Sequence, residues 1–487
     1  MVRFFQIAAL IALALALSGC GAKDEAATAS GAKIVPASAP AFVSIDSDLS
    51  SDQWKQVDEL LRKFPARSML VGELRSSLEE DSGLDYEDDI KPALGDEVDL
   101  VWLDFENEGS NIVGLTKPKD ETKFELLVDK ANAESGDELT FGKVGDWYVL
   151  ADSQDKIDRF TAMSKSGEKL ADDEVFNDAL AELPDEALVH VYVQGQGLVD
   201  ALQSFGGMQL GPFGVEKPEF LSAALAAEGS GLRLVGAGRA AEAPKDQPEP
   251  FESKLLDVVP GDAVAFLAFK GGDAYAEQLS ELEKNEAFRM GIREFEQMLG
   301  MPLSSLLEVF KDEVALYVRP GSPIPEVTLL IEAPNEQDSL GKVDAAITAL
   351  SKTLIAQPCH APTQEAGVDV KCMGLEEVEL RWAAFDQMVM VTIGQGAIAE
   401  LRSDDEKLAD DEGFNDARDA AGMPKESVGF MWLDLEDGIP LVLGLASASG
   451  GAIPSEIREN LEPLGSFLAW AEGDGRSGSF TAFLQID

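Results

Sequence analysis

Histidine, cysteine and basic side chains are scarce in this chain of 487 residues, and each scarcity removes a class of function. Two histidines leave little room for general-base chemistry, because a catalytic base needs several positioned partners. Lysine and arginine total 39 against 90 acidic residues, so the formal net charge is −51. A polyanion of this size repels phosphate backbones, and no window of the sequence is basic. We therefore expect no nucleic-acid partner.

Long hydrophobic runs are missing after the first residues. Arg3 precedes an apolar run from Phe4 to Leu17, which is shorter than the roughly 20 residues of a membrane-spanning helix. The run ends in Leu-Ser-Gly-Cys20, which resembles the lipobox of bacterial lipoproteins. That resemblance implies a diacylglycerol on the Cys20 thiol and cleavage before it. We therefore expect a signal peptide over residues 1–19 and an exported protein, lipid-anchored to the outer face of a bacterial membrane in the cell envelope.

Residues 20–33 are small or charged and have no apolar period, which predicts a flexible tether. Anionic lipid headgroups would repel the folded part, so we expect it to stand off the membrane. The acidic surface favours divalent cations or a basic protein partner. It serves solubility equally well and then needs no partner at all.

Three motifs recur in the same order in the two halves of the chain, which indicates a tandem duplication. Val35-Pro36 with Ala41-Phe42 recurs as Val259-Pro260 with Ala265-Phe266, and Asp96-Glu97-Val98 recurs as Asp312-Glu313-Val314. The tract Lys169–Ala179 recurs as Lys407–Ala417. We expect a first copy over residues 34–239, a proline-containing linker over 240–254 and a second copy over 255–487.

Strands within the first copy come in adjacent pairs. Val98–Phe105 and Asn111–Leu115 are separated by a short acidic turn, as are Leu139–Val144 and Trp147–Ala151, so both pairs are predicted hairpins. Helical spacing follows Trp54, Val57 and Leu60, then Phe124, Leu127 and Val128, then Ile157 and Phe160. This pattern predicts an α+β fold: two tandem copies of an antiparallel sheet with helices packed on one face.

The repeated acidic tract has two interpretations. Its carboxylates are hard oxygen ligands that suit calcium, although the spacing is not that of a twelve-residue calcium loop. Alternatively the tract begins a helix, with Asp172 or Asp410 as N-cap and Phe176 or Phe414 buried. The acids concerned are Asp172, Asp173, Glu174 and Asp178, with Asp410, Asp411, Glu412 and Asp416 in the second copy. Calcium apart, we expect no cofactor.

Cys359 and Cys372 occur in the second copy only, and export to an oxidising compartment predicts a disulfide between them. Closing such a loop contributes about 3 kcal/mol in the chain-entropy model. Cys359, His360 and Cys372 could instead hold a metal, but a fourth ligand and the paired short spacing of zinc sites are missing.

Two further motifs have a plain structural interpretation. Gly394-Gln-Gly396 with Ala399 matches a dinucleotide fingerprint, yet its counterpart Gly195-Gln-Gly197 has Asp200 where a small residue belongs, so a tight turn explains both. His190 lies in an alternating strand and aligns with Phe430 in the second copy, which favours packing over catalysis. Hydrolase signatures such as Gly-x-Ser-x-Gly and His-Glu-x-x-His do not occur.

Diffuse motifs of the first copy resemble the family called domain of unknown function 3352. Val35-Pro36 leading into Ala41-Phe42-Val43 resembles its opening strand, Gly83-Leu84-Asp85 through Leu94–Val98 resembles its central signature, and Leu170-Ala171 with Phe176 and Leu183-Pro184 resembles its closing one. The second copy departs from the pattern at Val309-Phe310-Lys311, where the glycine is missing. The resemblance implies an exported or membrane-tethered α+β protein and supplies no activity.

Three functions therefore stand side by side. The first is non-enzymatic binding of a ligand or an envelope protein, in a cleft between two similar lobes. The second is a structural or stand-off module of the envelope whose acidic surface binds cations. The third is a hydrolase that uses a carboxylate pair. We expect the first, and hence no enzyme.

Overall fold

The computed structural model describes residues 29–69, 72, 89–90, 93–135, 139–197, 218–243, 248–272, 286–322, 324–351, 356–357, 359, 364–375, 378–448 and 453–487. The predicted signal peptide and Cys20 lie outside these ranges, as do Asp200 and His360. Among the described helices, none is both long and apolar enough to cross a membrane.

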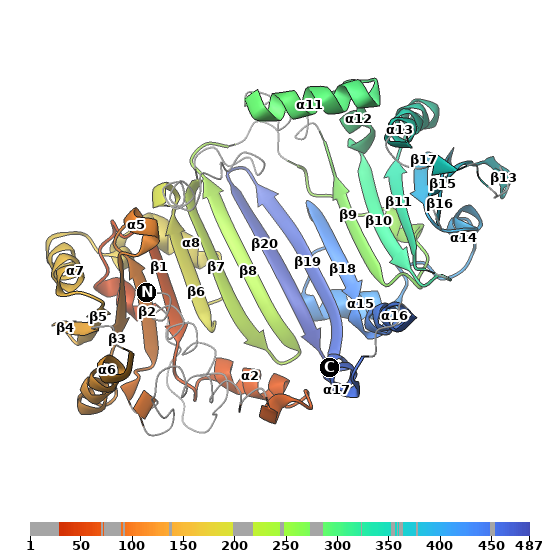
Figure 1. The fold of residues 1–487 in the computed structure, drawn as a ribbon. Coiled ribbons are helices and arrows are strands. Elements are labelled where there is room, and N and C mark those ends of the chain that lie inside the picture. The colour runs from red at the N-terminus through yellow and green to blue at the C-terminus, as the bar shows by residue number, and fades with distance from the viewer. Residues whose placement is uncertain are drawn as a thin grey trace.

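One antiparallel sheet of 18 strands extends through both copies (Figure 1). A separate two-stranded hairpin consists of β13 (Gln364–Glu365) and β14 (Val368–Asp369). The first copy contributes β1 (Ala41–Asp46), β2 (Glu97–Trp102), β3 (Ile112–Thr116), β4 (Thr140–Val144), β5 (Trp147–Ala151), β6 (Val189–Gln194), β7 (Pro218–Glu228) and β8 (Gly231–Ala240). The second contributes β9 (Ala265–Lys270), β10 (Glu313–Arg319), β11 (Glu326–Glu332), β12 (Ala356–Gln357), β15 (Lys371–Leu375), β16 (Val378–Phe385), β17 (Met388–Thr392), β18 (Gly429–Asp434), β19 (Leu464–Asp474) and β20 (Ser477–Ile486).

The strand order is the same in the two copies. The first runs β4-β5-β3-β2-β1-β6-β7-β8 and the second runs β16-β17-β11-β10-β9-β18-β19-β20, with β15 and β12 added beyond β16. The two series meet where β8 pairs antiparallel with β20. Because β8 and β20 are equivalent strands that pair antiparallel, an approximate two-fold axis passes between them, perpendicular to the sheet.

Antiparallel pairing and the α+β class are as predicted, but helices cover both faces of the sheet and not one (Figure 1). In the first copy, one face packs on α7 (Gln154–Ser166) and α8 (Glu174–Ala181). The opposite face packs on α2 (Asp52–Leu61) and α6 (Glu121–Ser135). The cause is visible in β3, whose five residues are all buried, because strands that are apolar on both faces need a cover on each side.

Further helices complete the same layers. Where α7 and α8 cover the first copy, α14 (Ala397–Leu401) and α15 (Glu412–Ala421) cover the second. The remaining helices are α5 (Glu106–Gly109), α11 (Glu286–Leu299), α12 (Leu303–Leu307), α13 (Glu336–Ser351), α16 (Leu435–Ala448) and α17 (Ser455–Leu461), with short 3-10 helices η2 (Ser30–Lys33), η4 (Leu170–Asp172), η6 (Leu255–Asp257) and η7 (Glu308–Phe310).

The predicted hairpins are both present. Strand β4 pairs with β5 around Gly145, whose positive φ of 61° is a conformation that glycine adopts at no steric cost. Strand β2 pairs with β3, with α5 between them. The three predicted apolar helical stretches form α2, α6 and α7.

The last residues of the predicted tether are part of the fold. Residues 30–33 form η2, in which Gly31 and Ala32 are buried. The Glu97 carboxylate holds this segment, because it accepts hydrogen bonds from the Ser30 hydroxyl and from the Gly31 N–H at 3.0 Å. Glu313 does the same in the second copy, where it accepts from the Ser253 hydroxyl and from Lys254 N–H at 2.9 Å.

Candidate functional site: an apolar face at the junction of the copies

The central strands β7, β8, β20 and β19 expose apolar side chains on one face of the sheet. Cross-strand partners point to the same face, so the registers Leu225↔Leu234↔Ala482↔Ala469 and Ala223↔Gly236↔Phe480↔Ala471 define two neighbouring rows across the junction. We call these eight residues, together with Leu221 on β7, the junction face.

Three large side chains of the junction face remain accessible to solvent. Relative exposure is 36% for Leu221, 43% for Leu234 and 44% for Phe480. Counted from the hairpin turns that precede β8 and β20, Leu234 and Phe480 occupy equivalent positions in the two copies. The duplication therefore places an exposed apolar side chain on each side of the two-fold axis.

Helix α2 covers only one end of these strands (Figure 1). Its Gln53 side chain exchanges two hydrogen bonds with the backbone of Ala227, at 3.2 Å from Nε2 to O and 2.7 Å from N to Oε1. Trp54 and Leu60 of the same helix pack near Leu225. Leu221, Leu234 and Phe480 lie beyond the end that α2 covers, and their side chains are exposed.

Charge is missing from the junction face, although the chain as a whole carries −51. Every one of its nine residues is apolar or glycine, whereas 26% of the chain is charged. On the opposite face of the same four strands, Ala224, Ala226, Phe483 and Trp470 are buried. The uncharged junction face is thus exposed at Leu221, Leu234 and Phe480 and buried at Ala469 and Ala482. Exposed apolar patches of soluble proteins commonly mark binding surfaces.

A second group of unusual residues lies within the core of the first copy. Asp46, Glu97 and Asp99 are acids of β1 and β2 whose exposures are 8%, 5% and 0%. Burial raises the pKa of Asp46 to about 6, against hydrogen bonds from the Ser51 hydroxyl and the Asp48 N–H. Burial, followed by the charge of Glu97, raises the pKa of Asp99 well above its ordinary value.

The buried acids stand beside a serine and a histidine, yet they form no catalytic triad. Asp99, Ser44 and His190 lie in one cross-strand row of β2, β1 and β6. The Ser44 hydroxyl donates to Glu97 Oε1 at 3.2 Å, and the His190 Nε2 is 2.8 Å from the Pro184 carbonyl oxygen. The Ser44 hydroxyl donates to Glu97 and not to His190, so no base is placed to activate it. Ser44 is also buried, so a substrate could not reach it.

Residues 4–141 match the family model DUF3352, a protein of unknown function. This match confirms the resemblance over the opening and central motifs of the first copy. No curated protein matches the chain.

Two solved structures share a low similarity. Crystal form I of TP0453 is 12% identical, with 48% of this chain and 79% of that chain covered and a TM-score of 0.24. Crystal form IV of TP0453 is 12% identical, with 46% and 76% covered and a TM-score of 0.23.

The acidic tracts, which lie outside the segment matched by DUF3352, begin helices. The N-caps are Asp173 and Asp411, one residue later than predicted at Asp172 and Asp410. Their carboxylates accept from the N–H groups of Phe176 and Phe414 at 2.8 and 2.7 Å, and both phenylalanines are buried as predicted. In the first copy the shift arises because Leu170–Asp172 form η4, which moves the extended N-cap conformation to the next residue.

The calcium hypothesis finds no support in these tracts. Asp173 and Asp411 cap helices, and the Asp178 carboxylate pairs with Arg239 at 2.7 Å. Asp172 belongs to η4, Asp410 directly precedes the N-cap of α15, and Asp416 lies within that helix. Over the described ranges, no group of three or more His, Cys, Asp or Glu side chains could hold a metal ion.

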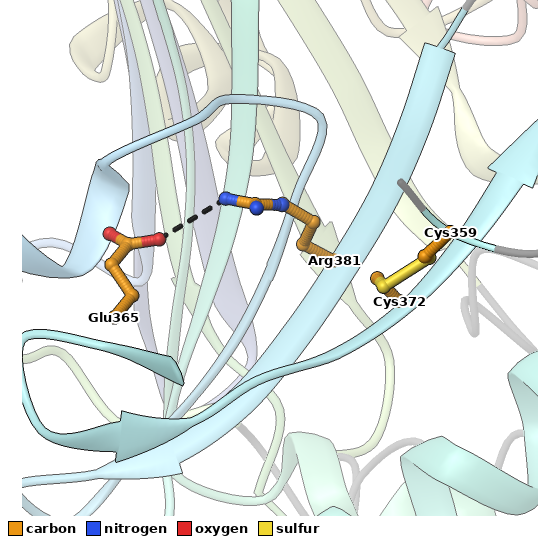
Figure 2. Close-up of a disulfide and its surroundings, with 4 residues drawn as sticks. All are labelled: Cys359, Glu365, Cys372 and Arg381. Atoms are coloured by element: carbon orange, nitrogen blue, oxygen red, sulfur yellow. Dashed lines mark hydrogen bonds and ion pairs between the residues drawn. A yellow bond between two sulfur atoms is a disulfide. The ribbon is translucent and has the colours of Figure 1, made fainter. Parts of the chain in front are cut away.

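The predicted disulfide between Cys359 and Cys372 is present (Figure 2). The loop that it closes includes the β13–β14 hairpin and carries Glu365. Glu365 pairs with Arg381 at 3.2 Å and accepts a hydrogen bond from Ile398 N–H at 2.7 Å. Because Ile398 lies in the first turn of α14, directly after the Gly394-Gln-Gly396 turn, a protein carboxylate already occupies the place where a dinucleotide pyrophosphate would bind.

His190 has the structural role predicted for it. It is 7% exposed in β6, and Phe430 holds the matching place in β18, since Ser44 faces His190 as Ala268 faces Phe430. The buried acids were not predicted, although one signal was available. The repeated motif Asp-Glu-Val continues with Asp99 in the first copy and with Ala315 in the second, at a position that is fully buried in both.

Proposed function

We propose that this protein is a lipid-anchored lipoprotein of the bacterial cell envelope whose folded part is a non-enzymatic binding protein. The single observation behind the binding role is the junction face: an uncharged, partly exposed surface of aliphatic and aromatic side chains on a chain of net charge −51. Such a surface costs solubility unless a ligand or partner covers it. The occupant in this proposal is an apolar ligand or the apolar patch of an envelope protein.

The anchor in this proposal is Cys20, on the strength of the lipobox-like sequence before it. Labelled palmitate is expected to enter the wild-type chain and not the Cys20→Ser variant, and the wild type alone is expected to partition with membranes. Wild-type protein without label, or a Cys20→Ser variant that still partitions with membranes after processing, would refute the anchor.

The binding role is tested by placing charge on the junction face. In the Cys20→Ser background, which allows purification without detergent, the double variant Leu234→Glu/Phe480→Glu is expected to lose most of the fluorescence of bound Nile red, a neutral apolar probe. A matched control adds the same charge to apolar side chains that are exposed elsewhere, Val442→Glu/Ile457→Glu, whose positions are 63% and 50% exposed. Equal loss in both double variants, or no binding to the parent, would refute the role of this face.

A further inference from the structure

The two copies hold their first residues in the same way but fill the space beneath them differently. In each copy a buried glutamate, Glu97 or Glu313, accepts hydrogen bonds from the start of a 3-10 helix, with Gly31 N–H and Leu255 N–H at 3.0 and 3.3 Å. Gly31 and Leu255 are equivalent, because the carbonyl of Gly31 accepts from Val35 N–H and the carbonyl of Leu255 accepts from Val259 N–H. The hydrogen bonds from these amides to a buried glutamate are therefore a shared feature of the two copies.

Next to these hydrogen bonds, the Asp99 carboxyl of the first copy fills the space that the Leu255 side chain fills in the second. A Cβ built on Gly31 would lie 1.7 Å from Asp99 Oδ2, so glycine there is required by the Asp99 side chain. In the second copy, Leu255 replaces the glycine and Ala315 replaces the aspartate, and both are buried at 4% and 0% exposure. The same volume is filled in one copy by an acid and in the other by an apolar side chain.

The exchange extends along the neighbouring strand. Ser44 and Asp46 of β1 face Asp99 and Glu97, whereas their counterparts in the second copy, Ala268 and Lys270, face Ala315 and Glu313. The first copy thus places two buried acids opposite each other where the second places a base opposite an acid. Since the second copy forms the same sheet without the additional acids, the fold does not require them.

The added carboxyl is costly as it stands. Neither Oδ atom of Asp99 has a hydrogen-bond partner among the described residues, and the side chain is completely buried. An ionised carboxylate in this place would lack water, would have only the neighbouring Ser44 hydroxyl and the Lys117 ammonium to favour its charge, and would lie next to the Glu97 carboxylate. A neutral carboxyl avoids most of this cost, so the closed arrangement binds a proton.

We propose that Asp99, with Glu97 and Asp46, forms a proton-dependent latch that holds residues 30–33, the last residues of the segment 20–33 that the sequence predicts as a tether. When Asp99 is protonated, η2 packs closed over the sheet. When Asp99 loses its proton, repulsion from Glu97 and the need for water open the segment. The latch belongs to the first copy alone, because Ala315 has no proton to lose.

The charged groups around the latch set its direction. On β2, Glu97 disfavours ionisation of Asp99, and from the residues after β3 the Lys117 ammonium favours it. Asp48 and Asp96, which share Lys119, disfavour ionisation of Asp46. Across β1 the imidazole of His190 lies in the same row, with Nε2 bonded to Pro184. Burial and the carboxylates act together against ionisation, so we expect the latch to close in acid and open as pH rises.

Hydrogen exchange of the lipidated full chain in detergent tests this directly. For the amides of residues 31–35, corrected for intrinsic rates, opening that releases one proton lowers the protection up to tenfold for each pH unit above the ordinary carboxyl pKa. Asp99→Asn, which keeps the shape and cannot ionise, is expected to remove that slope. The equivalent amides 255–259 serve as an internal reference, because Ala315 takes the place of Asp99 there and the slope should be shallower.

A second variant keeps the test decisive if Asp99→Asn does not fold. Gly31→Leu/Asp99→Ala transplants the apolar pair of the second copy, and this variant is expected to keep the 31–35 amides protected at every pH. Wild-type protection that does not fall with pH would overturn the latch. The same slope in the wild type and in either variant would overturn it as well.

Discussion

Arg381 and Glu365 form an ion pair of 3.2 Å although only 3% of the Arg381 side chain is exposed, and the acid is supplied by the loop that the disulfide closes (Figure 2). A buried guanidinium depends on its partner, because an unpaired charge in the core is strongly destabilising. The Cys359–Cys372 bond therefore has two effects: it restricts the unfolded chain and it keeps Glu365 beside Arg381.

Removing the disulfide is expected to cost more than loop entropy alone. Cys359→Ser/Cys372→Ser should lower the free energy of unfolding by at least the roughly 3 kcal/mol that a loop of this length provides, measured by urea unfolding. Arg381→Met in the same background should recover part of the loss, since it removes the stranded charge. If Arg381→Met costs the same with and without the disulfide, the two are not coupled.

Helix caps give a sharper local test, because the acidic tract offers neighbouring candidates. Asp173→Ala and Asp411→Ala should each lower the free energy of unfolding by about 1 kcal/mol, since each removes an acceptor from the first turn of a helix. Asp172→Ala and Asp410→Ala, one residue earlier, are the matched controls and should change it much less. Equal losses at the neighbouring positions would contradict the assignment of the N-caps.

Local features of the fold could be predicted because their causes are local. The turn at Gly145-Asp146 and the apolar period of Trp54, Val57 and Leu60 each depend on a few neighbouring residues. The placement of helices on both faces could not be read in this way. It depends on which strands are buried on both sides, and that depends on packing between distant segments.

Neither candidate site follows from sequence pattern. The junction face forms only when β8 pairs with β20, two strands that are far apart in the chain. In the sequence, Leu234 and Phe480 have the alternation of any half-buried strand. Asp99 could not be predicted from the sequence for a different reason. In a chain with 90 acidic residues, an aspartate is expected at the surface, and only the comparison with Ala315 distinguishes it.

Gly236 allows the junction face to be blocked without charge. A Cβ built at this position comes no closer than 3.9 Å to any atom, and the backbone is in an ordinary strand conformation. Gly236→Leu should therefore fold normally. Its side chain should fill the space between Leu234 and Phe480 and weaken apolar probe binding several-fold in a fluorescence titration. Gly444→Leu, where a Cβ meets nothing within 4 Å, should leave binding unchanged. Unimpaired binding in Gly236→Leu would place the probe elsewhere.

Asp46 predicts how stability responds to pH. Its pKa is raised from the model-compound value of 3.8 to about 6, so the folded state binds a proton that the unfolded state has already released. Its contribution is complete below pH 4 and is lost as pH rises through about 6, with a total of about 3 kcal/mol. Other carboxylates add their own slopes, so the difference between variants is the useful quantity.

The measurement compares wild type with Asp46→Asn by urea unfolding at pH 4, 6 and 8. The asparagine keeps one oxygen to accept from the Asp48 N–H, and its NH2 group replaces the second oxygen and faces the Ser51 hydroxyl, to which it can donate. It cannot ionise opposite Glu97. We expect the variant to gain relative to wild type as pH rises from 4 to 8. Asp48→Asn, at a neighbouring and less buried position, is the control. A constant difference between Asp46→Asn and wild type at all three pH values would show that Asp46 is already ionised throughout, and that the acids opposite each other on β1 and β2 are tolerated as charges.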